Sequence, residues 1–372
     1  MENKLELYKN HVNDMFGVNK IEDYSEEEID RIIERMLKFL PNDGKLYKYK
    51  SLEGESFKNT LESLKEGYIW LAKASSLNDE FDGSINFDPK KDMDIIKNEI
   101  FQNPVEFLNM ITNYFYNQNG YSVYKKPIDK IYANKIVSCY NKETGELDKD
   151  KAVKLIMKMS HYNYNDVLKY VEEMEIYLNK LIFKNEDALK QMLSQFLTFN
   201  KTNRDKMLVF SLTENYNSDI MWSYYTYNKG VCIEYDFNLI KKLPLDIKRY
   251  FISIYKVIYG EKDVVSFVDD FKYFLSGKVD SEYLKKGNAK LLPQIITKKK
   301  QWENEKEWRL VLFNIENKLY ANIVSSIFMT DETLKNKNVK EIIEVAKNNS
   351  WNIKVRKLNF IQTGYTFVEY NE

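Results

Sequence analysis

The chain has 372 residues, and its 56 basic and 56 acidic side chains give a formal net charge of zero. This balance excludes the strong overall field that draws a protein to nucleic acid or to a membrane surface, although a local basic patch stays possible. The sequence has no apolar run of about 18 residues, so no transmembrane helix is predicted, and residues 1–6 lack the apolar core of a signal peptide.

The cysteines and histidines limit the chemistry further. Cys139 and Cys232 make no disulfide framework, which favours a reducing cytoplasm. His11 and His161 are the only histidines, so a metal site with several histidine ligands is impossible and a Ser-His-Asp triad is not expected.

The N-terminal region is predicted to be a helical arm over residues 1–45. Ser25-Glu26-Glu27-Glu28 has the pattern of a capping box, and apolar residues between Ile29 and Leu40 follow at helical spacing. Pro41-Asn42-Asp43-Gly44 then breaks the chain. The next predicted elements are a strand at 46–50, a helix at 57–66 that Gly67 ends, a second strand at 68–71 and a polar turn at 75–82.

Residues 92–204 differ in character, because most of their segments have a helical period that is strongest between Val167 and Ile182. We interpret them as a helical insertion in a core domain formed by residues 46–91 and 205–372. The later core elements are predicted as strands at 206–212, 230–235, 253–257, 307–313, 323–329 and 351–358, with helices at 281–302 and 331–348. The sequence therefore predicts an α+β fold with a mixed, mostly antiparallel sheet.

The stretch from Gln301 to Phe313 passes from a charged, helix-like run into a strand. Alternation along that strand would put Glu305, Glu307 and Arg309 on one face, and Trp308, Leu310 and Leu312 on the other. Two carboxylates and a guanidinium in front of a tryptophan indicate a polar site. The competing interpretation is a solvated edge strand that carries an ion pair.

Three further segments are candidates for the site. Asn78-Asp79-Glu80-Phe81-Asp82 follows a strand and is either a simple acidic turn or a loop that lines a site and holds a metal through its acids. Ser218 to Tyr225 is predicted as a short helix that buries Ile220, Met221, Trp222 and Tyr225, and a tyrosine there could stack on a planar base. Lys48, between Tyr47 and Tyr49, is either a surface lysine or a binding residue.

No phosphate loop of the GKS/T kind, no GxGxxG fingerprint and no calcium-loop spacing occurs in the sequence.

If the candidate segments form one site, the acidic loop after the second strand should bury Asn78 and turn Asp79 toward the pocket, because a polar turn after an apolar strand needs hydrogen-bond partners.

Taken in order, six segments resemble a bacterial family catalogued as domain of unknown function 2971. The family patterns are Y-K-Y, N-D-P-F-E, S-L-S, M-W-x-x-Y, K-G-x-x-I-x-F and W-x-x-E-x-E-W-R. The matching segments here begin at Leu46, Asn78, Phe210, Met221, Lys229 and Trp302. The resemblance runs from about Leu46 to Leu358 without the helical insertion. Glu80 replaces the family's proline and Asp82 its second acid.

A more distant likeness is to ADP-ribosyltransferases, which bind NAD in a cleft between two small sheets. This chain has Lys48, Tyr49, Ser211 and Glu305-Lys306-Glu307 in a compatible order, with Lys48 at a position where that family has histidine or arginine. The likeness implies NAD as substrate, with Glu305, Glu307 and Arg309 as catalytic residues. Together with the acidic loop and the short helix, it predicts a binding site made of Lys48, Tyr49, Asn78, Asp79, Ser211, Trp222 and Tyr225.

Three functions stay open at this point. The leading hypothesis is a cytoplasmic NAD-dependent ADP-ribosyltransferase or NAD glycohydrolase that acts as a toxin-like or phage-defence effector. The second is a non-catalytic sensor or scaffold that binds a protein partner through residues 92–204 and exposes an apolar patch there. The third is a nuclease that uses a divalent metal held by Asp79, Asp82, Glu305 and Glu307.

Overall fold

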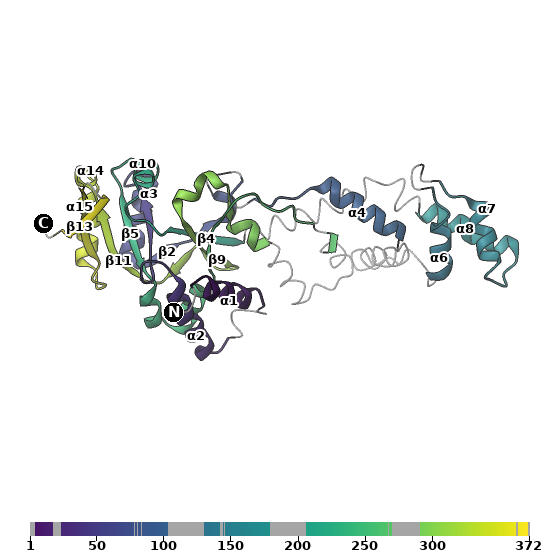
Figure 1. The fold of residues 1–372 in the computed structure, drawn as a ribbon, viewed down its shortest axis with the longest axis horizontal. Coiled ribbons are helices and arrows are strands. Elements are labelled where there is room, and N and C mark those ends of the chain that lie inside the picture. Colours follow the sequence, from purple (N-terminus) through teal and green to yellow (C-terminus); the bar gives the residue numbers. More distant parts are fainter. Residues whose placement is uncertain are drawn as a thin grey trace. The chain divides into compact units, whose positions relative to one another are not determined.

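The computed structural model describes residues 4–17, 24–77, 79, 81–82, 84–102, 130–141, 144, 146–178, 206–266, 268–269, 291–361 and 364–370. The chain forms two compact units, and each is considered separately (Figure 1). Unit 1 comprises Met1–Ile85, Asn203–Asp263 and Asn288–Glu372, and unit 2 comprises Asn86–Thr202 and Val264–Gly287.

Unit 1 is built on a sheet that has nine strands within the described residues. Its main path has the order β13-β12-β11-β5-β1-β4-β9-β6, and β3 pairs with β4 beside that path. The strands are β1 (Lys45–Lys50), β3 (Ala72–Lys73), β4 (Met207–Thr213), β5 (Val231–Asp236), β6 (Ile254–Lys256), β9 (Glu307–Phe313), β11 (Val324–Met329), β12 (Lys354–Ile361) and β13 (Gly364–Glu369). Strands β11 and β12 pair in parallel and the other neighbours are antiparallel, so the predicted α+β fold with a mixed, mostly antiparallel sheet is confirmed.

Helices and two small sheets complete unit 1. The helices are α1 (Lys4–Gly17), α2 (Glu26–Phe39), α3 (Gly54–Glu66), α10 (Asp219–Thr226), α11 (Leu245–Lys248), α14 (Asp331–Leu334) and α15 (Val339–Asn348). The 3-10 turns are η2 (Ala74–Ser76), η4 (Phe237–Lys242), η5 (Arg249–Ile252) and η6 (Lys300–Glu305). The small sheets pair β10 (Lys318–Tyr320) with β2 (Tyr68–Trp70), and β7 (Ile258–Tyr259) with β8 (Thr297–Lys298).

The main core of unit 1 forms on one face of the sheet. Strand β4 contributes Leu208, Phe210 and Leu212 to it, and β9 contributes Trp308, Leu310 and Leu312. Helix α2 begins with the predicted capping box at Ser25 and lays its apolar stripe on this core. Because side chains alternate along a strand, the odd-numbered residues of β4 and β9 up to Val311 point to the opposite face, where the polar site lies.

Trp308 anchors this arrangement beneath the polar face. Its ring is 3% exposed and lies stacked on Phe39 with 6.1 Å between the ring centroids. Its indole nitrogen donates a hydrogen bond to Glu214 Oε1 at 2.9 Å. Because its N–H is hydrogen-bonded, the buried indole packs stably in the core and fixes the position of the neighbouring residues of β9.

The sheet forks at β4, and this fork positions the site. One edge of β4 pairs with β9 from Met207 to Thr213. On the other edge, β1 pairs with β4 only at Tyr47 and Thr213, whereas β3 pairs at Val209 and Leu208. Strand β1 instead continues along β5 as far as Lys50. Between the two short contacts, residues 210–212 of β4 have no strand partner on this edge among the described residues.

Several predicted elements differ from the observed ones. The helix predicted over 281–302 is interrupted, because β8 pairs with β7 at Thr297 and Lys298; residues 281–290 lie outside the described part. The strand predicted at 351–358 begins later, at Lys354, and it is not the last strand, because β13 follows it. The pairing of β8 with β7 joins segments that are distant in the sequence, so no local pattern indicated it.

The described part of unit 2 is mainly helical. It contains α4 (Pro89–Gln102), α6 (Lys130–Val137), α7 (Lys149–Met157) and α8 (Tyr164–Leu178). It also contains two isolated β-bridges, one between Phe87 and Val265 and the other between Tyr140 and Leu147. Unit 2 thus includes a second chain segment beyond the single predicted insertion at 92–204. Across the described residues of both units, none of the helices has the length and apolar character needed to span a membrane.

Candidate functional site

A pocket of about 280 Å³ lies where β1 and β4 diverge in unit 1. We call it the fork pocket. It is lined by residues of β1 (Tyr47, Lys48, Tyr49, Lys50), of β2 and β3 (Trp70, Ala72), of the acidic loop and the turn before it (Ser76, Leu77, Asp79, Asp82), of β4 (Val209, Ser211, Leu212, Thr213), of α10 (Met221, Tyr224, Tyr225), and of β8, η6 and β9 (Lys298, Trp302, Glu305, Glu307).

Beneath and beside this pocket, five buried charged residues form what we call the buried ion cluster: Asp82, Lys298, Glu305, Glu307 and Arg309. Each is at most 7% exposed. Three carboxylates face two cations, so the cluster retains one uncompensated negative charge when all five groups are ionised. Charges removed from water are costly unless they are paired and hydrogen-bonded, and here each ion contacts an opposite charge.

Arg309 holds the cluster together. Its guanidinium donates to both oxygens of Asp82 at 2.7 Å, to Glu307 Oε1 and Oε2 at 2.7 and 3.1 Å, and to the Ile295 carbonyl. These bonds use all five N–H donors of the side chain. Arg309 does not line the pocket, and its donors hold Glu307 and Asp82 in position; its catalytic role stays a prediction.

Glu307 is the best-compensated carboxylate of the cluster. Burial raises the pKa of Glu307, but Arg309 and Lys298 outweigh that effect and bring it down to about 2. The Ser211 side chain adds a hydrogen bond to the carboxylate. Glu307 is therefore ionised at any physiological pH.

Lys298 bridges the two glutamates. Its ammonium lies 2.6 Å from Glu305 Oε2 and 3.1 Å from Glu307 Oε2. Burial lowers the pKa of Lys298, but the nearby Glu307 and Glu305 carboxylates raise it by more, and the net pKa is raised. Lys298 therefore stays charged and fixes the spacing of the two acids.

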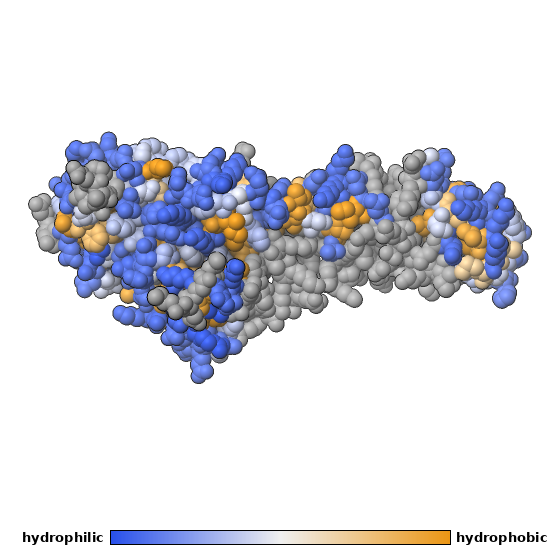
Figure 2. Space-filling view, viewed as in Figure 1, coloured by the Kyte–Doolittle hydropathy of each residue, from blue (hydrophilic) through white to orange (hydrophobic). Residues whose placement is uncertain are grey.

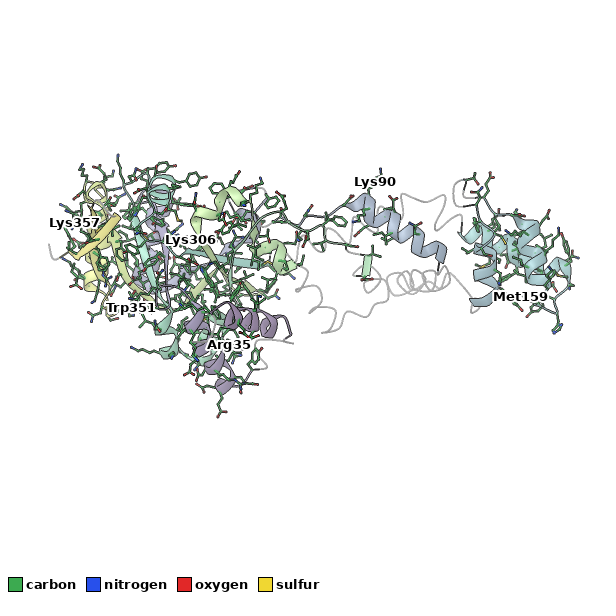
Figure 3. All side chains as sticks on the ribbon, in the orientation of Figure 1. Arg35, Lys90, Met159, Lys306, Trp351 and Lys357 are labelled. Carbon is green, nitrogen blue, oxygen red and sulfur yellow. The ribbon has the colours of Figure 1, made fainter. Side chains whose placement is uncertain are left out.

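Glu305 reaches the pocket by a different route from the predicted one. It is the last residue of η6 and not part of β9, and Lys306 follows it in the left-handed region with a φ of 44° (Figure 3). This turn, and a hydrogen bond from Thr213 Oγ1 to the Glu305 carbonyl at 2.5 Å, direct the carboxylate inward. The Tyr225 hydroxyl donates to Glu305 Oε1 at 2.6 Å.

The predicted alternative of a solvated edge strand is wrong, because β9 lies between β4 and β6 in the sheet. Both Glu305 and Glu307 are buried, at 7% and 5% exposure. The ion pair of this segment is therefore a buried one that belongs to a pocket.

Aromatic side chains form the wall of the pocket next to Glu305. Tyr224 contacts both Trp302 and Tyr225 edge to face, with ring centroids 5.6 and 5.0 Å apart. The Trp302 indole nitrogen donates to Asp79 Oδ2 at 3.2 Å, which ties this wall to the acidic loop. The hydroxyl of Tyr225 stays protonated, because burial and Glu305 raise its pKa.

The acidic loop contributes two of its carboxylates. Asp79 lines the pocket, and its backbone hydrogen bond from Phe81 and its contacts with Trp302 and Lys299 lower its pKa. Asp82 is held by Arg309. Lys262 donates to the carbonyls of Phe81 and Ser84 and so fixes the loop. Asn78, which was predicted to be buried, and Glu80 lie outside the described residues.

Lys48 and Lys50 line the opposite part of the pocket, on β1. The Lys48 ammonium donates to the Ser211 carbonyl at 2.7 Å, which satisfies a backbone acceptor that the fork leaves without a strand partner. Burial lowers the pKa of Lys48 to about 7; Lys50 and Arg309 act in the same direction and Glu307 opposes them. Burial also lowers the pKa of Lys50.

The other predicted binding residues have structural partners. Tyr49 lines the pocket, but its hydroxyl bonds to the Asn215 carbonyl and the Ser218 amide and so holds the loop before α10. Trp222 does not line the pocket; it is buried edge to face against Tyr49 and donates to the Tyr216 carbonyl. Ile220, predicted to be buried, is 61% exposed, because the short α10 buries Met221 and Trp222 instead.

Lys298, Trp302, Lys50 and Tyr224 are among the pocket residues that were not singled out from the sequence. Lys298 lay inside a predicted helix, and nothing local indicated that β7 would pair with it. Trp302 belongs to the W-x-x-E-x-E-W-R pattern, and Lys50 to the same short strand as Lys48, so both signals were present. Tyr224 was one tyrosine among 28, and only its position at the pocket rim distinguishes it.

The carboxylates of the site are not arranged for a metal ion. Among the described residues, no group of three or more His, Cys, Asp or Glu side chains could hold one. Lys298 and Arg309 occupy the space between Asp82, Glu305 and Glu307, where a cation would have to bind.

Comparison with known proteins matched one segment of this chain to a family model. No curated protein and no solved structure matched the chain. The likeness to ADP-ribosyltransferases therefore stays a prediction. Residues 221–310, which include most of α10, Lys298, η6 and the first part of β9, match a family described as Protein of unknown function (DUF2971). The resemblance of this chain to the DUF2971 family, predicted from its motifs, is thereby confirmed.

Proposed function

We propose that this protein binds NAD in the fork pocket and breaks the bond between nicotinamide and ribose, passing ADP-ribose to water or to an acceptor. The observation that carries the proposal is the Glu305 carboxylate, held by Tyr225 and Lys298 in a concave, aromatic-walled pocket next to a buried ion cluster with excess negative charge. Such a place favours a ligand or a transition state that carries positive charge.

The residues fit the charge changes of this reaction. The C1′–N bond breaks with its electron pair on the ring nitrogen, so nicotinamide leaves as a neutral molecule and positive charge develops on the ribose. Glu305 stabilises that charge. Water or an acceptor hydroxyl then bonds to C1′ and gives its proton to a base, for which Glu305 is the candidate. Glu307 and Lys298 keep Glu305 in position.

The aromatic wall suits the nicotinamide ring. Trp302, Tyr224 and Tyr225 line the pocket beside Glu305, and a cationic ring gains from contact with an electron-rich aromatic face. The pocket volume of about 280 Å³ is at the lower end of the range of ligand pockets, about 300–1,000 Å³. It therefore takes the nicotinamide and ribose, and the adenosine end of NAD lies outside it.

The proposal is tested by the release of nicotinamide from NAD. Glu305→Gln keeps the shape of the side chain but removes its charge, and we expect a loss of turnover of about 10²-fold or more with the fold retained. The matched control is Glu303→Gln, on the same turn η6 but exposed to solvent, which should leave turnover unchanged. Full activity in Glu305→Gln would refute the assignment of Glu305.

An enzyme that consumes NAD would injure the cell that contains it, so a toxin-like or phage-defence effector in the cytoplasm is the corresponding biological role. Expression of the wild-type chain should then lower cellular NAD and slow growth, whereas Glu305→Gln should do neither. Equal NAD levels in cells with the two proteins would count against an effector of this kind.

A scaffold that binds a protein partner through residues 92–204 is a second candidate, because unit 2 exposes large apolar side chains. Met157, Met159, Tyr162, Tyr164 and Ile176 are each 36–61% exposed in α7, α8 and the turn between them. Hydrophobic side chains are visible in this region of Figure 2, and Met159 is labelled in Figure 3. Exposed apolar groups of this kind mark interaction surfaces. A partner that binds wild type should not bind a Met159→Ser, Tyr162→Ser variant.

A further inference from the structure

The fork pocket separates its charges along β1. Tyr47 marks one end, because it pairs with Thr213, and Thr213 lies beside Glu305 and Glu307. Lys50 is three residues further along the strand, about 10 Å away at about 3.3 Å per residue. Lys48 and Lys50 project to the same side of β1 because they are two residues apart, and this is the main-core side, where the Lys48 ammonium lies over the Phe210 ring, opposite the side of Tyr47 and Glu307. The pocket thus has a carboxylate end and a lysine end.

The lysines lack the direct ion pairs that the other buried ions of the site make, although Glu307 acts on Lys48 from a longer distance. In the part of the chain that the structure describes, no carboxylate lies within ion-pair distance of either ammonium. The hydrogen bond from Lys48 to the Ser211 carbonyl explains why Lys48 is there. It does not explain Lys50, whose ammonium makes no hydrogen bond to the described residues. Burial disfavours the charged form of both lysines, so two neighbouring lysine cations at this place do not stabilise the fold.

An anion bound between the two lysines would supply the missing charge. Phosphoryl oxygens are strong acceptors, and lysine binds them as a mobile point charge. A ligand that matches the whole pocket therefore carries a planar cation at the Trp302 and Glu305 end and a phosphoryl group at the Lys50 end. A nicotinamide nucleotide has both groups, one on each side of a single ribose.

We propose that Lys48 and Lys50 form a phosphoryl subsite that binds the 5′-phosphate next to the nicotinamide ribose, so the fork pocket selects the nucleotide over the nucleoside. This subsite rests on the proposed function for the identity of the ring, but it makes a separate claim about binding. It also fixes the direction in which the ligand lies along β1.

The test compares nicotinamide mononucleotide with nicotinamide riboside, which differ only in the phosphate, by calorimetric titration of the full chain. We expect the mononucleotide to bind at least tenfold more tightly. Lys50→Met should remove that preference and leave the affinity for the riboside unchanged, whereas Lys50→Arg should retain most of it. Lys45→Met, on the same strand but outside the pocket lining, is the matched control and should behave as wild type.

Equal affinities for the two ligands, binding of neither, or a preference that survives in Lys50→Met would overturn the subsite. The nicotinamide-release assay separates this failure from that of the proposed function. Release of nicotinamide without a preference for phosphate keeps the chemistry and removes the subsite. A preference for phosphate without release keeps the subsite and removes the chemistry.

Discussion

At the scale of a single residue, Glu305 is a buried carboxylate that is held from two sides. Its two oxygens have different partners, the Tyr225 hydroxyl at 2.6 Å and the Lys298 ammonium at 2.6 Å. Glu307, two residues later, accepts hydrogen bonds from Arg309 and Lys298, so both of its carboxylate oxygens are bonded within the buried ion cluster. The two acids that look alike in the sequence therefore have different hydrogen-bond partners, and both line the fork pocket.

The phosphoryl subsite makes affinity depend on pH through Lys48. Its pKa is about 7 in the folded protein, against 10.5 for an ordinary lysine, and Lys50, Glu307 and Arg309 are the charged groups that act on it. As the pH rises from 7 to 9, the free protein loses the proton that phosphate binding needs. The affinity for nicotinamide mononucleotide should therefore fall over this window, as measured by titration at each pH.

Two controls accompany this prediction. Nicotinamide riboside carries no phosphate, so its affinity should change little between pH 7 and pH 9. Lys48→Met removes the titrating group, so the fall for the mononucleotide should be smaller in that variant, with only Lys50 left to titrate. An affinity that rises with pH would mean that the lysines do not bind the phosphate.

At the scale of elements, the alternation of side chains along the chain predicted the apolar face of β9 correctly. It did not predict the structure of the segments just before β9. Trp308, Leu310 and Leu312 do face the core, because a buried strand leaves its apolar residues no other place. The position of Glu305 was not predictable from that pattern, since the left-handed Lys306 ends η6 just before the strand. Lys298 was missed because its strand exists only through pairing with β7.

Close approach of α10 to β1 is a second element-scale feature that shapes the pocket. Gly230 lies between α10 and β5, and a Cβ added there would come within 2.2 Å of the Lys50 carbonyl and 2.7 Å of Thr226 Cβ. Moving the backbone away costs free energy, because a side chain at this position must push α10 and β1 apart. Glycine is required here by space and not by an unusual φ angle.

We expect Gly230→Ala to lower the free energy of unfolding by about 1–3 kcal/mol and to weaken nucleotide binding, because Lys50 moves with the strand. Gly260→Ala is the matched control, since a Cβ at Gly260 meets nothing within 4 Å. Urea unfolding and calorimetric titration of both variants check this. Equal stability and affinity in the two variants would show that α10 and β1 are free to separate.

At the scale of the whole molecule, the class of fold was predicted correctly from the sequence, whereas the strand pairing that forms the fork pocket was not predicted. Three of the six motif segments lie in the part that matches DUF2971, and two of these, beginning at Met221 and Trp302, contribute residues to the pocket lining. The fork itself was not predictable, because it depends on β1 leaving β4 after one residue pair and following β5. Pairing between distant strands has no local signature.

All residues that line the fork pocket belong to unit 1. A ligand bound there stabilises the structure that contains its site. Nicotinamide mononucleotide should therefore slow amide hydrogen exchange in β1, β4, η6 and α10, while α7 and α8 of unit 2 exchange at an unchanged rate. Protection of α7 and α8 alone would place the ligand elsewhere and favour a binding role for unit 2.

The most direct test of the central claim is an experimental structure of the Glu305→Gln variant with NAD, because this variant should bind NAD without consuming it. We expect the nicotinamide ring against Trp302 and Tyr225, C1′ of its ribose next to residue 305, and the adjoining phosphate next to Lys48 and Lys50. NAD bound outside the fork pocket, or a pocket left empty at a saturating NAD concentration, would contradict the account.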